Sequence, residues 1–139
     1  MIRSGSHRQL LMGRILSGFA VLFLVVDSVT KLLRVQAAID GTAELGYQPG
    51  IVVPLGIILA LCVIVYVIPR TAVLGALLLT GYLGGAIATH VRVGNPLFSH
   101  VLFPVYVALL LWGGLWLREP RVRALIPFFT SSRFTGRSR

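Results

Sequence analysis

Three long stretches of the chain contain no Asp, Glu, Lys or Arg: residues 45–69, 71–91 and 93–117. Each is long enough for a helix that crosses about 30 Å of hydrocarbon, which takes roughly 20 residues. A fourth apolar stretch, 11–33, can also span if Arg14 and Lys31 extend their charged ends toward opposite interfaces. The apolar residues are continuous and do not alternate with polar ones, which excludes the strands of a membrane barrel. The pattern predicts four transmembrane helices.

The composition agrees with a membrane protein of one domain. Of the 139 residues, 56% are hydrophobic and 12% are charged, and the mean hydropathy is +0.88, which is far from an average soluble chain. We therefore predict an all-α fold, an integral membrane four-helix antiparallel bundle with both termini in the cytoplasm. The predicted divisions are a tail at 1–10, a four-helix domain at 11–118 with spans at about 11–33, 51–68, 71–91 and 96–117, and a basic tail at 119–139.

The positive charges are distributed unevenly along the chain. Most of the 13 Lys and Arg residues lie in the two tails and in the loop between the second and third spans. Because positive residues are retained on the cytoplasmic side, this bias places both termini there. The net charge of +9 then points to anionic lipid headgroups at the C-terminal tail and not to a nucleic acid. A cleaved signal peptide is disfavoured, because Asp27, Lys31 and Arg34 would lie between its apolar core and the cleavage site.

Polar side chains within the spans gather in the outer half of the predicted bundle. Asp27 and Lys31 are four residues apart with the acid first, the favourable order for an ion pair on a helix. The third span brings Tyr82 and His90 to the same depth, and the fourth begins there with His100. Since ionisable residues inside a membrane mark functional sites by default, we predict a polar pocket formed by these five residues. The alternative for Asp27 and Lys31 is a structural ion pair that anchors the helix end.

Three chemistries can be weighed for such a pocket. An apolar slot with a few polar groups suits a quinone or a lipid headgroup. A membrane acid such as Asp27 suits a proton-linked carrier, which would have to be oligomeric at four helices per chain. His90 and His100 could ligate haem or a metal, but no further ligand set accompanies them, so haem is disfavoured and no metal ligand is assigned. No nucleophile with a base is visible, so no catalytic residue is assigned and an enzyme is the least favoured class. Cys62, the single cysteine, is expected in ordinary packing and allows no intramolecular disulfide.

Two sets of residues predict how the helices pack. Small residues at helical spacing allow a neighbouring backbone to approach closely, and they predict a seam, favoured within the bundle over one between two copies, at Gly81, Gly84, Gly85 and Ala88. Aromatic residues near the span ends are expected in the interfacial belt: Tyr66, Trp112 and Trp116.

Residues in and near the connections predict a short helix, two helix caps and a kink. Residues 35–45 mix alanines with acids and could form a short helix on the outer surface. Thr71 and Asn95 are expected to cap the third and fourth spans. Pro104 has no N–H to bond the carbonyl of His100, which predicts a kink in that region.

Motifs spread over residues 14–118 support a family assignment. The segments are Asp27-Ser-Val-Thr-Lys31-Leu32, Glu44-Leu-Gly-Tyr47, Ile68-Pro-Arg-Thr71, Thr80-Gly-Tyr-Leu-Gly-Gly85, Thr89-His-Val-Arg-Val-Gly-Asn-Pro96 and Pro104-Val-Tyr106. Together they resemble the DoxX-like family of small four-helix bacterial membrane proteins. The resemblance implies a multi-pass protein of the bacterial cytoplasmic membrane.

The wider grouping is named for proteins associated with a thiosulfate:quinone oxidoreductase. The resemblance therefore implies an accessory or quinone- or lipid-binding subunit of a membrane redox or stress-related system, with membrane redox proteins as partners. It supplies no catalytic residues. The alternative function is a small oligomeric proton-linked carrier that uses Asp27.

Overall fold

The computed structural model of the protein describes residues 7–126. Within that range the chain is helical and contains no strand. Its elements are α1 (His7–Leu32), α2 (Gln36–Glu44), the 3-10 turn η1 (Pro49–Ile51), α3 (Val52–Val67), α4 (Ala72–Arg92), the π-helical turn η2 (Leu97–Val101), α5 (Phe103–Arg118) and α6 (Pro120–Leu125). Residues 127–139 of the predicted basic tail lie outside the described range.

Four helical segments are long and apolar enough to cross a membrane: His7–Leu32, Pro49–Val67, Ala72–Arg92 and Leu97–Arg118. They confirm the all-helical, four-span fold class. The short helix expected after the first span is also present, as α2. The cytoplasmic position of the termini stays a prediction from the charge bias.

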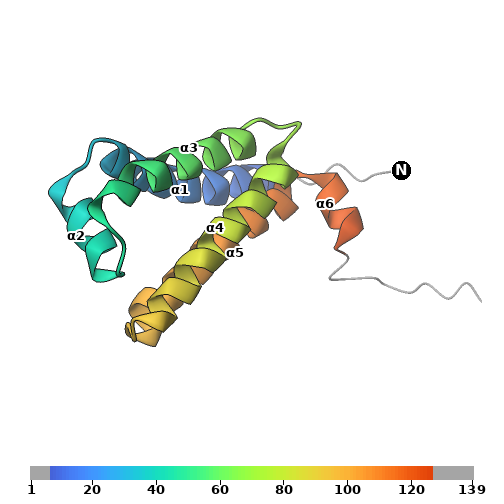
Figure 1. Ribbon diagram of the computed structural model, residues 1–139. Helices are drawn as coiled ribbons and strands as arrows, with labels where there is room; N and C mark the ends of the chain where they lie inside the picture. Colours follow the sequence, from blue (N-terminus) through green and yellow to red (C-terminus); the bar gives the residue numbers. More distant parts are fainter. Residues whose placement is uncertain (1–6, 127–139) are drawn as a thin grey trace, which may run out of the picture.

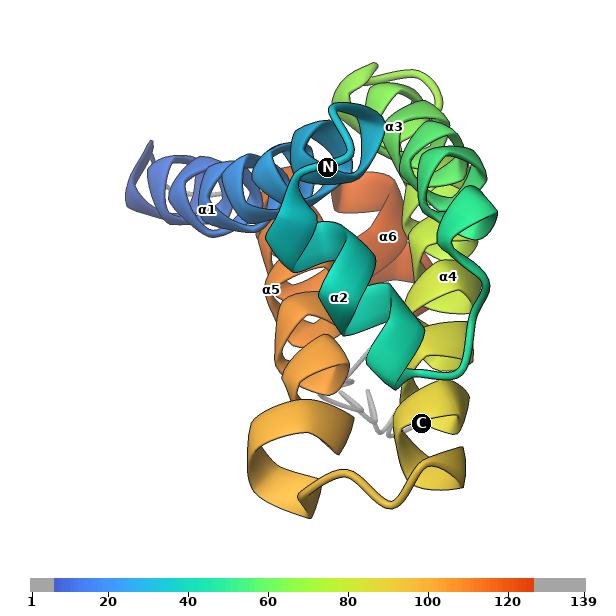
Figure 2. The same cartoon turned by 60° about the vertical axis from the view of Figure 1, so that its left-hand side comes forward.

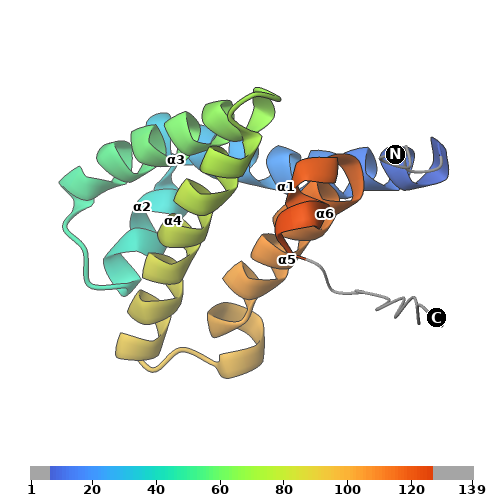
Figure 3. The ribbon, with the colours of Figure 1, turned by 90° about the vertical axis from the view of Figure 1, so that its right-hand side faces the viewer.

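The four long helices form two pairs that meet at one end and diverge at the other. α1 runs beside α3, and α4 runs beside α5 (Figure 1). The pairs join through contacts of α1 with α5 and of α3 with α4. They meet along the first half of α1, near the turn from α3 to α4 and near α6, while the first turns of α1 extend past α6 (Figure 3). We call this the terminal end, and we call the opposite end, which holds α2 and the turn between α4 and α5, the open end.

Tyr66 holds the core at the terminal end. Its side chain is 1% exposed, and its hydroxyl donates to the Leu111 carbonyl oxygen of α5 at 2.9 Å. The Ser17 hydroxyl of α1 lies 3.0 Å away and therefore donates to Tyr66. The Arg118 guanidinium lies over the ring, 5.2 Å from its centroid. The prediction that Tyr66 belongs to the interfacial belt is wrong, because its helix turns this side chain toward α1 and α5.

Glycines allow close helix contacts at the terminal end. A Cβ added to Gly13 would lie 2.8 Å from the Gly114 carbonyl oxygen, and a Cβ added to Gly114 would lie 2.9 Å from that of Gly13. Gly75 in the same way faces the backbone of Tyr66 across the turn from α3 to α4. These contacts bring α1 against α5 and α3 against α4 at backbone distance.

The prediction of a seam on α4 within the bundle is wrong, while a seam between two copies stays a prediction. A Cβ added to Gly81, Gly84 or Gly85 would meet no atom within 4 Å, and Ala88 is exposed. The small residues face open space because α4 diverges from the first pair along this half of its length (Figure 1).

The outward faces of the long helices are apolar. Phe19, Leu22, Leu61 and Leu109 each expose more than half of their side chain. Apolar surface of this extent is not left to water by a soluble monomer. On four helices of spanning length, it is the surface that contacts the lipid bilayer.

The caps differ from the expectation in detail. Thr71 is the N-cap residue of α4, but its hydroxyl donates to the Val65 carbonyl oxygen at 2.8 Å and does not accept from the helix. Asn95 does not cap the fourth span: its amide nitrogen lies 2.8 Å from Nδ1 of His90. The side chain binds back to the preceding helix, so the prediction of an Asn95 cap is wrong.

The irregularity expected near Pro104 is present. In η2 the Leu102 amide donates to the Leu97 carbonyl at 2.9 Å, five residues back. Regular α-helix resumes at Phe103, with Pro104 in its first turn, where the absent N–H costs little. The proline thus separates a wide turn from the body of α5.

Candidate functional site

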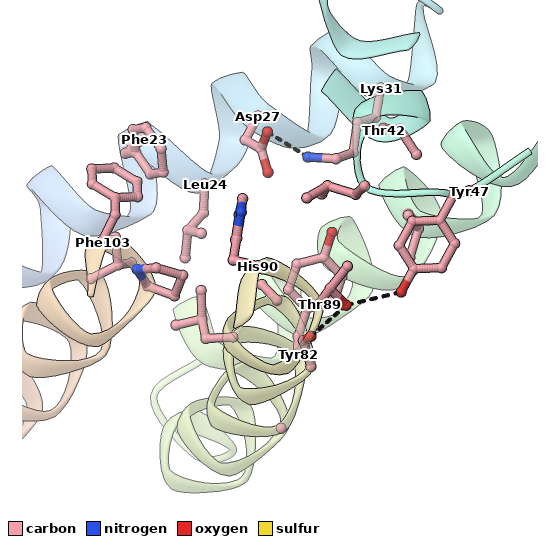
Figure 4. Close-up of a pocket in the computed structure, with 18 residues that line it drawn as sticks. Phe23, Leu24, Asp27, Lys31, Thr42, Tyr47, Tyr82, Thr89, His90 and Phe103 are labelled. Atoms are coloured by element: carbon pink, nitrogen blue, oxygen red, sulfur yellow. Dashed lines mark hydrogen bonds and ion pairs between the residues drawn. The ribbon is translucent and has the colours of Figure 1, made fainter. Parts of the chain in front are cut away.

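A cavity of about 400 Å³ lies at the open end between the two helix pairs. Its walls come from all four long helices, from α2 and from the segment after α2 (Figure 4). We call it the open-end pocket. Its polar lining residues are Asp27, Lys31, Thr42, Tyr47, Tyr82, Thr89 and His90, and the rest are apolar or glycine. This size falls in the range of small-molecule sites, about 300–1,000 Å³.

Asp27 and Lys31 form an ion pair in the pocket wall. Nζ of Lys31 lies 2.5 Å from Oδ1 of Asp27, and the two side chains are 15% and 35% exposed, respectively. The spacing in the sequence indicated this pair. Its two charges cancel, so the pair adds no net charge to the pocket, while the ammonium group keeps further N–H donors.

α1 is fixed beside the pair by a second polar contact. The Ser28 hydroxyl is buried and donates to the Gly56 carbonyl oxygen of α3 at 3.0 Å. The Thr30 hydroxyl donates to the carbonyl oxygen of Asp27 at 2.9 Å. The Ser28 bond holds the last turns of α1 against α3, while the Thr30 bond lies within α1. The contact with α3 therefore fixes the side from which Asp27 reaches the pocket.

His90 projects from α4 into the space that Asp27 faces from α1 (Figure 4). Its Nδ1 lies 2.8 Å from the amide nitrogen of Asn95. An amide nitrogen is a donor, so Nδ1 accepts, and the neutral ring carries its proton on Nε2. The Asn95 contact therefore makes Nε2 of His90 a hydrogen-bond donor.

His100 lies beside His90 but does not line the pocket. The two rings pack edge to face with their centroids 5.7 Å apart. His100 is exposed, and its Nδ1 lies 2.7 Å from the Ser99 hydroxyl. The structure thus brings four of the five predicted site residues to the pocket, namely Asp27, Lys31, Tyr82 and His90.

The rest of the pocket surface is largely apolar. Phe23 of α1 and Phe103 of α5 meet edge to face with centroids 5.0 Å apart. Leu24 and Pro104 also line the cavity. Tyr82 is half-buried and contributes a ring with one hydroxyl. A ligand in this space meets hydrocarbon on most sides.

The connection from α2 to α3 passes beside α4 (Figure 2), and its residues Leu45 and Tyr47 line the pocket. Thr42 is the one buried residue of α2. The Tyr47 hydroxyl lies 3.1 Å from the Thr89 hydroxyl of α4. Arg92, at the end of α4, donates to the Leu45 carbonyl oxygen at 2.7 Å. We call residues 36–48 the strap, because these two bonds fasten it to α4.

Residues 15–114 match the DoxX-like family. The chain belongs to the DoxX-like family. The match covers most of the chain and agrees with the motifs found in the sequence. Together with the four helices of spanning length, it makes this a multi-pass membrane protein of that family. No curated protein and no solved structure matches the chain.

The pocket of this DoxX-like protein offers hydrogen bonds within a hydrocarbon lining. Lys31, Tyr82 and His90 supply N–H or O–H donors. Among residues 7–126 no group of three or more His, Cys, Asp or Glu side chains could hold a metal ion. The arrangement suits an amphiphile with an apolar body and a small head that accepts hydrogen bonds.

The sequence interpretation missed the residues that fasten the strap. Tyr47 stands in a connection and Arg92 is the last residue of α4, and neither belongs to a periodic pattern that predicts a partner. The sequence offered one weaker indication. Arg92 is the one charged residue between the predicted third and fourth spans, and the N–H donors of an arginine can bond backbone carbonyls.

Proposed function

We propose that this DoxX-like protein binds a small amphiphilic molecule of the quinone or lipid class in the open-end pocket. In this proposal it is an accessory subunit of a membrane redox or stress-related system in the bacterial cytoplasmic membrane, with both termini in the cytoplasm. The observation that carries the proposal is the gathering of Asp27, Lys31, Tyr82 and His90 on one apolar cavity of about 400 Å³.

The chemistry of the pocket favours an uncharged head. Because Asp27 and Lys31 neutralise each other, a charged head would have to compete with an existing ion pair. A carbonyl oxygen can accept from the Lys31 ammonium group, the Tyr82 hydroxyl or Nε2 of His90 without that cost. The apolar wall then contacts a ring or an acyl chain. Carbonyl-bearing quinones and lipid esters both meet this description.

Two adjacent glycines on α4 give a matched test. Gly85 lines the pocket and Gly84 does not, and a Cβ added to either meets no atom within 4 Å. Gly85→Leu should therefore fill the pocket, while Gly84→Leu adds the same volume to an exposed surface. Both variants lose a helical glycine, so both are expected to stay folded.

The readout is mass spectrometry of the quinones and lipids that purify with each variant in a mild detergent. We expect one class of amphiphile to be retained by the wild type and by Gly84→Leu. We expect retention to fall by about tenfold or more in Gly85→Leu, which corresponds to about 1.4 kcal/mol. Equal retention by all three proteins, or no retained amphiphile in the wild type, would contradict the proposal.

A proton-linked carrier is the second candidate, because Asp27 lines the pocket and its side chain is 35% exposed. Asp27→Asn should then abolish proton flux into liposomes that contain a pH-sensitive dye. The control is Asp40→Asn, which changes an exposed acid on α2. If Asp27→Asn leaves flux unchanged and lowers thermal stability, the ion pair is structural and the carrier is rejected.

A further inference from the structure

A second apolar groove lies at the terminal end, away from the open-end pocket. It measures about 420 Å³ and runs between α5 and α6. Its lining residues are Ala108, Leu109, Trp112, Gly113, Trp116, Val122 and Ile126. None of them is charged, so the groove itself suits hydrocarbon. We call it the terminal groove.

Basic residues lie on the two helices that form the terminal groove. Arg118 ends α5, and Arg121 and Arg123 lie on α6, against the single acid Glu119. The Glu119 carboxylate caps α6 by accepting from the backbone amide of Arg121 at 3.5 Å. Positive charge therefore exceeds negative charge beside an apolar groove, which is the complement of an anionic amphiphile.

Arg123 has an unused donor. Its Nη2 is buried and makes no hydrogen bond with residues 7–126. A buried N–H of a charged group without a partner is costly, so an acceptor is expected there. On α6, Arg123 adjoins Val122 and lies three residues before Ile126, both of which line the groove. The backbone of Arg123 thus lies within one helical turn of two residues of the groove wall.

Arg118 also has an unpaired nitrogen, Nε, which is buried in the described part of the chain. Its guanidinium group, however, packs on the ring of Tyr66 in the core. A change at Arg118 would therefore disturb the helix packing as well as any ligand. Arg123 is the residue on which a ligand can be tested.

We infer that the terminal groove and Arg123 together bind one anionic phospholipid. The acyl chain lies in the groove against Trp112 and Trp116, and the phosphate accepts hydrogen bonds from the Arg123 guanidinium. A guanidinium group suits this partner, because its planar set of N–H donors matches two phosphate oxygens. This lipid site is separate from the open-end pocket, and neither proposal depends on the other.

The chain provides its own probe for the site. It contains two tryptophans, and both line the groove. Bromine atoms on an acyl chain quench tryptophan fluorescence on contact. The full chain is reconstituted in phosphatidylcholine vesicles that contain either brominated phosphatidylglycerol or brominated phosphatidylcholine at the same mole fraction. The ratio of quenching by the two lipids reports the preference for the anionic headgroup.

We expect brominated phosphatidylglycerol to be preferred by about fivefold, the factor that one arginine near an anionic surface contributes. Arg123→Gln should remove this preference. Arg121→Gln is the matched control, since Arg121 is exposed on the same helix, and it should keep the preference. Arg123→Lys retains the charge and should keep most of it. Unchanged quenching by brominated phosphatidylcholine would show that each variant is folded and inserted.

Three results would overturn the inference. Equal quenching by the two brominated lipids in the wild type would mean that the groove does not select a headgroup. An equal loss of preference in Arg121→Gln and Arg123→Gln would assign the selectivity to diffuse surface charge. An absence of quenching by either lipid would mean that protein, and not lipid, covers the tryptophans.

Discussion

Two adjacent glycines of α5 should respond in opposite ways to the same substitution. In Gly114→Ala the new Cβ would lie against the Ser17 hydroxyl, 2.8 Å from the Ser17 amide nitrogen and 2.9 Å from the Gly13 carbonyl oxygen. In Gly113→Ala the new Cβ would meet no atom within 4 Å. The close neighbours of Gly114 include backbone atoms, so no change of rotamer can relieve the contact. α1 and α5 would have to move apart.

The expected difference in the free energy of unfolding between the two variants depends on helix propensity and on overpacking. Replacing a helical glycine by alanine stabilises the helix by up to about 1 kcal/mol, and this gain is shared by both variants. Only Gly114→Ala adds the cost of overpacking, about 1–3 kcal/mol. The shared gain cancels in the comparison. Gly114→Ala should therefore be about 1–3 kcal/mol less stable than Gly113→Ala.

The assay is unfolding of both variants in mixed micelles with increasing denaturing detergent. Tryptophan fluorescence reports the transition, because Trp112 and Trp116 flank the two glycines on α5. Gly113→Ala should unfold at or above the wild-type midpoint and Gly114→Ala below it. Equal midpoints, or a lower midpoint for Gly113→Ala, would refute the close contact between α1 and α5 at Gly114.

Two further substitutions test other contacts of the fold. Tyr66→Phe leaves the Ser17 hydroxyl and the Leu111 carbonyl oxygen without their bonds to Tyr66, and it should cost about 1–2 kcal/mol in the same unfolding assay, since one hydrogen bond between membrane helices averages about 0.6 kcal/mol and reaches about 1.7. An unchanged midpoint would place the tyrosine outside the core. Arg92→Gln removes the bond to the Leu45 carbonyl oxygen, and it should speed amide hydrogen exchange in the strap while changing the global stability by less than about 0.5 kcal/mol. Exchange at the wild-type rate would mean that the strap is held by other contacts.

The four spans could be predicted from the sequence because the bilayer sets the length and the apolar composition of each helix that crosses it. A helix that crosses hydrocarbon must bond its backbone internally and present apolar side chains along its length. The same requirement hides which face of each helix is buried. In a soluble helix the polar face marks the outside, but here both the core face and the lipid face are apolar.

For Tyr66 and the glycines of α4, the sequence did not show which face of the helix is buried. Tyr66 stands near Arg70, where an interfacial position was the natural interpretation, and only the rotation of α3 shows that the ring points inward. Gly81, Gly84 and Gly85 have the spacing of a packing seam, yet α4 presents them to open space. Spacing alone does not show whether a neighbouring helix is present.

Contacts among the polar side chains were predicted correctly where a short range of sequence defines them. Asp27 and Lys31 pair across one helical turn, so their spacing was sufficient. The approach of His90 toward Asp27 required only that successive spans alternate in direction, since the first and third spans then end on the same side. Tyr47 and Arg92 were missed, because their bonds depend on how a connection folds back over α4.

Photolabelling with a quinone shows directly whether the open-end pocket binds an amphiphile. A quinone that carries a photoreactive diazirine on its tail is added to the protein in native membranes, and the labelled peptides are identified by mass spectrometry. If the quinone binds in the open-end pocket, we expect labels near Asp27 on α1 and within residues 82–90 on α4. Both labels should be lost when excess unlabelled quinone is added. Labels that spread over lipid-facing side chains such as Leu109, and that the competitor does not reduce, would show that the pocket does not bind the quinone.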